Sequence, residues 1–258
     1  MADQALILAA GRGRRLEPLT LHTPKPLLEV GGRRLIEWHL DALARAGVRD
    51  VVINIAHLRE RFAPALGDGS RYGLTINYSD EGTEPLETGG GMLRALALLR
   101  DAPFIVVNAD VYAEVDFSRL RLPPQRDAHL LLVPNPPEHR DGDFWLCPDG
   151  QVDPAPATMT PNASAERLTY AGIGVYSARL FNDWRDAYPD HRGALLDPPR
   201  FPLAALLKRA MRERRISGER HCGNWHDIGT PDRLARLRTE LAGSNCGQPK
   251  PRPPLHKV

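Results

Sequence analysis

A short apolar run that ends in two closely spaced glycines constrains the fold of this chain more than any other feature. Residues 5–10 are apolar without a break, which is typical of a buried parallel strand. Gly11 and Gly13 follow, and glycine lets the backbone take positive φ and bring successive N–H groups close to a ligand. Fixed positive charge then comes from Arg12, Arg14, Arg15 and Lys25. A strand that feeds a cationic glycine loop predicts a binding site for a triphosphate.

Two other kinds of glycine loop do not fit this motif. A Walker loop needs Lys and then Ser or Thr after its last glycine, and the dinucleotide fingerprint needs a third glycine where Leu16 stands. A surface turn with solvated arginines is the alternative that carries no function.

Strand-like and helix-like segments alternate after this loop. Apolar residues recur at helical spacing from 34 to 46, and short apolar runs predict strands at 51–55, 74–78 and 104–107. This alternation predicts βαβ units, and hence an α/β fold with a Rossmann-like, mostly parallel sheet flanked by helices. The other expected strands are 127–133, an edge strand at 144–146, 168–177 and 221–228, and the other expected helices are 58–66, 88–99, 201–214 and 231–241.

We expect one domain over residues 1–242, with halves of about 1–126 and 127–242. Residues 148–165 interrupt the second half and predict an irregular insertion. The proline-rich, basic segment 243–258 has almost no core residues, which predicts a disordered tail. No internal repeat is present, so a C-terminal β-helix is not expected.

Composition excludes several classes of partner. A net charge of +2 over 258 residues gives no reason to expect nucleic acid or an anionic membrane. No apolar run approaches the roughly twenty residues of a membrane span. Three scattered cysteines (147, 222 and 246) give neither a disulfide framework nor zinc spacing, and the N-terminus lacks a signal-peptide pattern. We therefore expect a cytoplasmic protein whose ligands are small anions.

Three consecutive glycines, Gly89 to Gly91, stand at the start of a predicted helix for which Thr88 is the expected N-cap. Each glycine costs about 1 kcal/mol relative to alanine inside a helix. Fraying of the helix is one explanation. We favour the other, room for a flat base against the backbone, because glycine permits close approach.

Two aspartates that follow predicted strands are candidate ligands for Mg²⁺. Asp110 comes after strand 104–107, and Asp227 lies near the end of strand 221–228. Ligands of open α/β sheets bind at the carboxyl ends of the strands, and magnesium uses one or two carboxylates together with phosphate oxygens. The alternatives are a turn cap at Asp110 and, at Asp227, a hydrogen bond to the start of the helix that Thr230 caps.

The glycine loop and the residues after it resemble the signature of the sugar-1-phosphate nucleotidyltransferases. The matching residues are Gly-x-Gly-x-Arg-Leu-x-Pro-Leu-Thr, from Gly11 to Thr20, and Pro-Lys-Pro at 24–26. The resemblance extends from about Ala5 to Leu241 and implies a fold related to the GT-A glycosyltransferases. By the same resemblance, the first half of the chain binds a nucleotide and the second half binds a sugar.

The resemblance also implies roles for individual residues. Those implied in catalysis are Arg15, Lys25 and Asp110, and Asp110 and Asp227 would hold magnesium. The implied nucleotide contacts are Gly11, Arg12, Gly13, Lys25, Glu81, Gly89, Gly90 and Asn108. The implied contacts to the acceptor sugar are Asp143 and Gly172.

Three further stretches, 21–26, 85–91 and 142–144, are similar to a branch of the family that acts in cell-wall recycling. This similarity implies transfer of UMP from UTP to N-acetylmuramate α-1-phosphate with release of pyrophosphate. The carboxylate of that acceptor needs a cation, and Arg140 and Arg200 are the candidates; both could equally be solvated surface arginines. The Glu-Lys-Pro motif of the glucose-1-phosphate and GDP-mannose enzymes is absent.

Alternative functions stay open at this point. One is another member of the family, a mannose-1-phosphate guanylyltransferase or a glucose-1-phosphate thymidylyl- or uridylyltransferase. A second is a non-catalytic sensor of nucleotide sugars, and a third is a glycosyltransferase, whose metal motif can also end in an aspartate after a strand. We expect a monomer, because a β-helix through which some relatives trimerise is not predicted.

Overall fold

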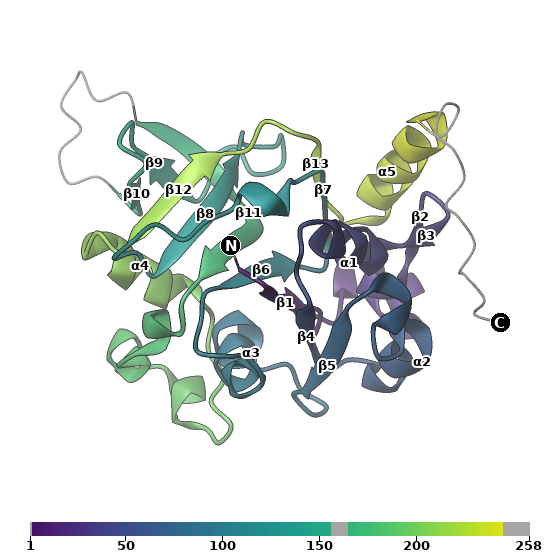
Figure 1. The fold of residues 1–258 in the computed structure, drawn as a ribbon, viewed down its shortest axis with the longest axis horizontal. Helices are drawn as coiled ribbons and strands as arrows, with labels where there is room; N and C mark the ends of the chain where they lie inside the picture. Colours follow the sequence, from purple (N-terminus) through teal and green to yellow (C-terminus); the bar gives the residue numbers. More distant parts are fainter. Residues whose placement is uncertain (1, 156–164, 245–258) are drawn as a thin grey trace.

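A nine-stranded mixed sheet forms the centre of the computed structural model, which describes residues 2–155 and 165–244 (Figure 1). The sheet runs in the order β10-β9-β11-β6-β1-β4-β5, and β8 and β12 extend from β11. Its strands are β1 (Gln4–Leu8), β4 (Asp50–Ile55), β5 (Thr75–Asp80), β6 (Phe104–Asn108), β8 (Ala128–Val133), β9 (Phe144–Leu146), β10 (Val152–Asp153), β11 (Glu166–Tyr176) and β12 (Ile216–Arg220).

The first half of the chain supplies four neighbouring parallel strands. β1 pairs in parallel with β4 and β6, and β4 pairs in parallel with β5. β8 and β12 are also parallel, whereas β11 is antiparallel to β6, β8 and β9. The predicted α/β fold with a mostly parallel sheet is confirmed, and the antiparallel β11 joins the two halves of the chain.

Helices cover both faces of this sheet. They are α1 (Leu35–Arg45), α2 (Phe62–Leu66), α3 (Glu87–Ala95), α4 (Ala204–Arg212) and α5 (Pro231–Ser244). Ala5 and Ile7 of β1 are buried together with α1 and α2, whereas Leu6 is buried with α3 and α4. Successive side chains of a strand point to opposite faces, so the unbroken apolar run at 5–10 marks a strand buried on both sides.

Two small two-stranded sheets lie beside the main one. β2 (Glu29–Val30) pairs with β3 (Arg33–Arg34), and β7 (Val111–Ala113) pairs with β13 (Trp225–Asp227). α5 packs leucines 234, 237 and 241 against Leu28, Val30 and Leu35, so the end of the described chain returns to its beginning (Figure 1).

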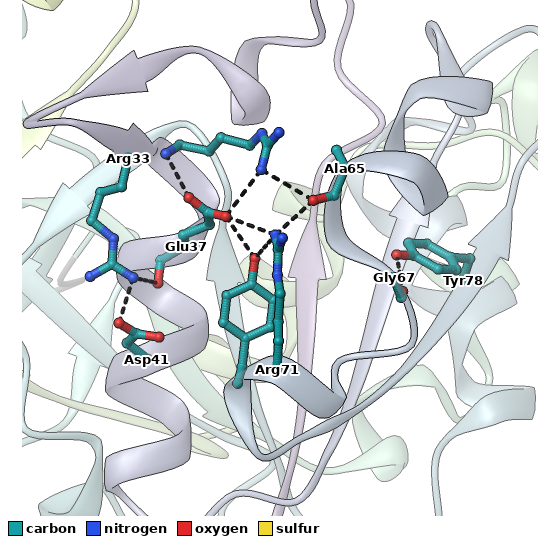
Figure 2. Close-up of polar contacts among 9 residues, drawn as sticks. Arg33, Glu37, Asp41, Ala65, Gly67, Arg71 and Tyr78 are labelled. Atoms are coloured by element: carbon teal, nitrogen blue, oxygen red, sulfur yellow. Dashed lines mark hydrogen bonds and ion pairs between the residues drawn. The ribbon is translucent and has the colours of Figure 1, made fainter. Parts of the chain in front are cut away.

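Polar contacts around Glu37 fix the start of α1 (Figure 2). Its carboxylate accepts hydrogen bonds from the Arg34 amide at 2.8 Å, the Tyr72 hydroxyl at 2.7 Å and Arg71 at 2.9 Å. Burial raises the pKa of Glu37, but these hydrogen bonds and the nearby guanidinium groups outweigh burial and lower it overall. Arg34 and Arg71 also donate to the Ala65 carbonyl, which ties α1 to α2.

Several predicted segments differ from the observed ones. Strand β12 was not expected, because its sequence, Ile-Ser-Gly-Glu-Arg, has one large apolar residue. The predicted edge strand at 144–146 is β9, but β10 lies outside it, within the predicted insertion. The predicted helices at 58–66 and 88–99 each combine an α-helix with a 3-10 turn, at Arg59–Arg61 and Leu96–Leu98. Residues 156–164 of the insertion, 245–258 of the tail, and hence Cys246, lie outside the described residues.

Packing within the fold explains why α3 begins with a glycine triplet. A Cβ at Gly89 would lie 2.5 Å from the Phe201 ring, and one at Gly90 would lie 2.4 Å from the Pro199 carbonyl oxygen. The amides of both glycines donate to the Phe201 carbonyl, at 2.9 and 3.1 Å. Residues 199–201 therefore fill the space beside Gly89 and Gly90, whereas a Cβ at Gly91 would meet the Glu81 carboxylate and the Asn54 side-chain amide. The contact of a base with this backbone stays a prediction. Thr88 is not the N-cap, since α3 starts at Glu87 after Leu86.

Gly90→Ala should destabilise the protein by about 1–3 kcal/mol, because the added methyl group overpacks the contact with the Pro199 backbone. Urea unfolding followed by circular dichroism measures the change. The matched control is Gly243→Ala in α5, where a Cβ meets nothing within 4 Å. This variant should be as stable as the wild type or up to about 1 kcal/mol more stable, because alanine favours a helix over glycine. Equal stability of the Gly90 variant and the wild type would contradict the packing explanation.

Within the part of the chain that the structure describes, no helix combines the length and the apolar character that crossing a membrane requires.

Candidate active site

A cavity of about 380 Å³ opens where β1, β4 and β6 end. The glycine loop, the Lys25 turn and the first residues of α3 complete its wall. The predicted site residues in its lining are Gly11, Gly13, Arg15, Lys25, Glu81, Asn108 and Asp110. Arg14 also lines the cavity, whereas Arg12, Gly89 and Gly90 do not.

The two glycines of the loop are needed for different reasons. Gly13 has a φ of 66°, and its carbonyl accepts hydrogen bonds from the Leu16 amide and the Thr20 hydroxyl. A residue with a side chain is strained in this left-handed conformation. Gly11 has ordinary dihedral angles, and a Cβ there would meet nothing within 4 Å. The fold itself therefore does not require a glycine at position 11, and the absence of a side chain there leaves open space in the cavity.

Lys25 and Asp110 form an ion pair in the cavity wall. The Lys25 Nζ lies 2.9 Å from Asp110 Oδ2, and the Lys25 side chain is only 8% exposed, against 44% for Asp110. The 3-10 turn Lys25–Leu27, set between Pro24 and Pro26, holds the lysine there. Both residues line the cavity, and the carboxylate is the only partner of the ammonium group in this ion pair. The positive charge of Lys25 is therefore well placed to neutralise an anion bound in the cavity.

The β7–β13 pair brings Asp227 next to Asp110. Asp227 is the register partner of Val111, and the Ile228 amide donates to the Asp110 carbonyl at 2.9 Å. Arg233 contacts the Asp227 carboxylate. A Cβ at Gly229 would lie 3.0 Å from Arg233 Nη1, 3.1 Å from Arg15 Nη2 and 3.2 Å from Asp227 Oδ2. Asp227 does not line this cavity, but it lies at its edge, close to Arg15 and to the backbone of Asp110.

The carboxylates of Asp110 and Asp227 are donors of the kind that magnesium prefers. Across residues 2–155 and 165–244, no three His, Cys, Asp or Glu side chains gather as potential metal ligands. Magnesium takes one or two carboxylates and fills its other positions with water and phosphate oxygens. This pair therefore fits a magnesium ion that is bound together with a triphosphate.

A buried polar pair lies at the β4 and β5 side of the cavity. The Asn54 amide donates to Glu81 Oε1 at 2.6 Å, and Asn54 Oδ1 accepts from the Ala9 amide at 2.6 Å. Glu81 Oε2 accepts from the Leu86 amide at 2.7 Å. Burial raises the pKa of Glu81 more than these hydrogen bonds lower it. Our sequence analysis missed Asn54, although a lone polar residue near the end of an apolar strand was a usable signal.

His39 of α1 supports the backbone beside Asp110. Its Nε2 lies 2.7 Å from the Val111 carbonyl oxygen and donates to it. Burial lowers the pKa of His39 to about 4, so the ring is neutral at physiological pH. The sequence shows only a histidine on an apolar helix face, and this pattern gives no indication of a partner seventy-two residues away.

The predicted acceptor residues lie outside this cavity. Asp143 Oδ2 accepts from the Tyr170 amide at 2.8 Å, and its Oδ1 lies 3.0 Å from His139 Nε2. Gly172 has a φ of 74° and lies against the Asn108 side chain. Arg140 donates to the Pro137 carbonyl, and Arg200 lies 3.9 and 3.8 Å from the carboxylates of Glu84 and Glu87.

Comparison with known proteins agrees with this fold and identifies the family. Residues 4–129 match the family model described as nucleotidyl transferase. N-acetylmuramate alpha-1-phosphate uridylyltransferase of Neisseria meningitidis is 45% identical over 246 residues, which cover 93% of this chain and 99% of that protein. The protein of the same name from Caulobacter vibrioides is 33% identical over 256 residues, 92% of this chain and 96% of its own.

The fold has solved counterparts too. UDP-glucose pyrophosphorylase, crystallised with UDP-glucose, superposes with a TM-score of 0.71 at 16% identity and covers 95% of this chain and all of its own. This chain belongs to the nucleotidyl transferase family of enzymes.

Proposed function

We propose that this protein transfers UMP from UTP to N-acetylmuramate α-1-phosphate and releases pyrophosphate. The observation that carries the proposal is the Lys25–Asp110 ion pair in the wall of the glycine-loop cavity, with Asp227 brought to the edge of this cavity by the β7–β13 pair. The names of the two relatives support the choice of nucleotide and acceptor. Transfer to mannose or glucose 1-phosphate by the same site is the alternative within the family.

The reaction asks mainly for positioning and charge neutralisation. An oxygen of the acceptor phosphate attacks the α-phosphorus of UTP, the bond from that phosphorus to the bridging oxygen breaks, and pyrophosphate leaves with the electron pair. Two unit charges about 4 Å apart repel by roughly 4 kcal/mol at an effective dielectric of 20. Lys25, Arg15 and Arg14 face the cavity and would offset this repulsion.

Asp110 and Asp227 would hold the magnesium ion. Bound there, the ion supplies positive charge shared by both phosphates. In the structure each carboxylate already contacts a cation, Lys25 for Asp110 and Arg233 for Asp227. Phosphate oxygens would draw Lys25 toward themselves and so free Asp110 for the metal.

The order of the strands suggests how UTP would lie. β6 ends at Asn108 on one side of β1, and β4 and β5 lie on the other. A triphosphate at Lys25 and Asp110 would therefore place its base on the side of Asn54 and Glu81. We assign the base contact to this pair, because its amide and carboxyl groups offer both donors and acceptors.

A substrate matrix tests the proposed function. The purified protein is mixed with Mg²⁺ and each of UTP, dTTP, GTP, CTP and ATP, crossed with the 1-phosphates of N-acetylmuramate, N-acetylglucosamine, glucose and mannose. Pyrophosphate release and chromatography of the products are measured. We expect the fastest turnover with UTP and N-acetylmuramate 1-phosphate. A preference for GTP with mannose 1-phosphate would reject the proposal, and nucleotide binding without turnover with any acceptor would identify a sensor.

Gly11→Ala should weaken UTP binding about tenfold or more without loss of stability. The added methyl group meets nothing in the fold and would project into space that the nucleotide needs. Calorimetric titration with UTP gives the affinity, where tenfold corresponds to about 1.4 kcal/mol. Gly243→Ala again serves as the control. Unchanged UTP affinity in the Gly11 variant would mean that the nucleotide does not approach this part of the loop.

We further propose that residues 1–242 act as one catalytic unit and as a monomer. The pairing of β6 with β11 supports a single unit, since it joins the two halves in one sheet. Light scattering at micromolar concentration should give the mass of one chain, and a stable trimer would refute the monomer.

A further inference from the structure

A second cavity, of about 280 Å³, lies next to the proposed catalytic centre. Three prolines (134, 136 and 137) and Trp225 give it apolar walls, and Glu138, Asp227, Arg233 and Arg236 give it charge. Asp227 separates the two cavities, because its carboxylate lies beside Gly229, which lines the first one. A molecule whose phosphate is bound near Asp227 can therefore extend into the second cavity.

One cation in this cavity has no counter-ion. Arg233 is paired twice, with Asp227 and, through its Nε at 2.8 Å, with Glu138. His226 lies within 2.9 Å of both Asn224 and Glu240. Throughout residues 2–155 and 165–244, Arg236 makes neither a hydrogen bond nor an ion pair. If a magnesium ion took the Asp227 carboxylate, Arg233 would still be paired with Glu138. Arg236 would therefore remain the arginine of this cavity without a counter-ion.

The position of Arg236 on α5 determines which part of a bound sugar its side chain can contact. Arg236 follows Arg233 by three residues, so the two side chains emerge from the same face of the helix. A rise of 1.5 Å per residue places Arg236 about 4.5 Å farther along the helix axis. This separation is close to the width of one sugar ring. A pyranose with its 1-phosphate at Asp227 would thus present its far substituents to Arg236.

The walls of the cavity also suit a sugar. The Trp225 ring is fixed by a hydrogen bond of 2.9 Å from its Nε1 to the Ala171 carbonyl. The C–H groups of a pyranose can pack on this ring and on the prolines opposite, while its polar edge faces the arginines. Arg140 and Arg200, our candidates from the sequence, do not line this cavity, and each already has contacts of its own.

We propose that this second cavity receives the far end of the acceptor sugar, beyond Gly172, and that Arg236 binds a carboxylate on the sugar there. Arg236 is then the residue that selects carboxylate-bearing sugar 1-phosphates over neutral ones. The inference rests on the proposed function, since it concerns the acceptor of that reaction.

Arg236→Gln tests the inference against a matched control, Arg238→Gln. Arg238 lies on the same helix but donates to the Glu29 carbonyl, outside this cavity. The KM and kcat are measured for N-acetylmuramate 1-phosphate and for N-acetylglucosamine 1-phosphate, which lacks the carboxylate. We expect Arg236→Gln to lower kcat/KM for the muramyl acceptor roughly 10- to 100-fold through KM. The values for the neutral acceptor and the KM for UTP should stay as in the wild type and in the control.

Two more variants exclude a merely structural role. Arg236→Lys keeps the charge without the planar fork and should recover part of the muramyl activity, whereas Arg236→Glu should lose more than Arg236→Gln. Equal losses with both acceptors, or no loss with either, would overturn the inference and leave the proposed function standing. A wild-type protein that does not use N-acetylmuramate 1-phosphate would instead overturn the proposed function itself.

Discussion

Asp110→Asn and Asp227→Asn should each lower turnover about a thousandfold while the protein stays folded. Asparagine keeps the shape of the side chain and removes the charge that a divalent ion needs. A bound metal contributes several kcal/mol to stabilising developing charge, and about 1.4 kcal/mol corresponds to a factor of ten in rate. Asp110→Asn removes the counter-ion of the buried Lys25 side chain, but the asparagine amide oxygen can still accept its hydrogen bond, and Asp227 and its partner Arg233 are both partly exposed. We therefore expect a moderate loss of stability at Asp110 and a smaller one at Asp227. Steady-state rates at saturating UTP and a thermal melt of each variant give the two quantities.

The double variant is the sharper measurement. If both aspartates serve one ion, the combined defect should be smaller than the product of the single defects. Calorimetric titration with Mn²⁺ in the presence of UTP should show weaker binding in all three variants. Asp101→Asn is the control, because Asp101 is exposed and precedes β6 at the opposite end of that strand. Wild-type turnover at limiting magnesium in either single variant would remove that aspartate from the site.

Lys25→Met should lower turnover about 100- to 1,000-fold, the range found when one positioned donor to a developing charge is removed. The Lys25 side chain is buried, so methionine is a better replacement than alanine because it keeps the apolar stem in place. The substitution also leaves Asp110 without its ion-pair partner, but Asp110 is 44% exposed and water can replace the ammonium group. We therefore expect a small change in stability beside a large change in rate.

Lys208→Met is the matched control for this variant. Lys208 is exposed on α4, far from the cavity lining, and its replacement should leave the rate unchanged. Raised ionic strength should not mimic the Lys25 defect, since salt screens buried pairs less than exposed ones. Full activity of Lys25→Met would exclude the lysine from the site and would weaken the assignment of the whole glycine-loop cavity.

Local sequence signals predicted the frame of the site. Each of these signals can be recognised from a few neighbouring residues: the apolar run at 5–10, the glycines at 11 and 13, and the aspartate after β6. A strand ending in glycine and a carboxylate at a strand end point to the same edge of a parallel sheet. These signals predict that Lys25, Asp110 and Asp227 lie near one edge of the sheet.

Long-range packing accounts for what the sequence did not reveal. Gly89 and Gly90 are explained by Phe201 and Pro199, which are more than a hundred residues away and make no local pattern with them. Arg233 contacts both Asp227 and Glu138, yet in the sequence it is one of many arginines on an exposed helix. β12 was missed because its neighbour β8, rather than its own side chains, makes it a strand. Pairings of this kind exist only after the chain has folded.

The pairing of β7 with β13 ties activity to the completed chain. During synthesis, β1, the glycine loop, Lys25 and Asp110 leave the ribosome long before β13 and α5 are made. A nascent chain therefore has most of the cavity-lining residues while half of the proposed metal site is still missing. α5 then packs its leucines beside the Lys25 turn and carries Arg233 to Asp227. A product of premature termination upstream of β13 would lack Asp227 and therefore half of the proposed metal site. Catalytic activity should thus appear only after the last elements of the chain, β13 and α5, have been synthesised and have folded.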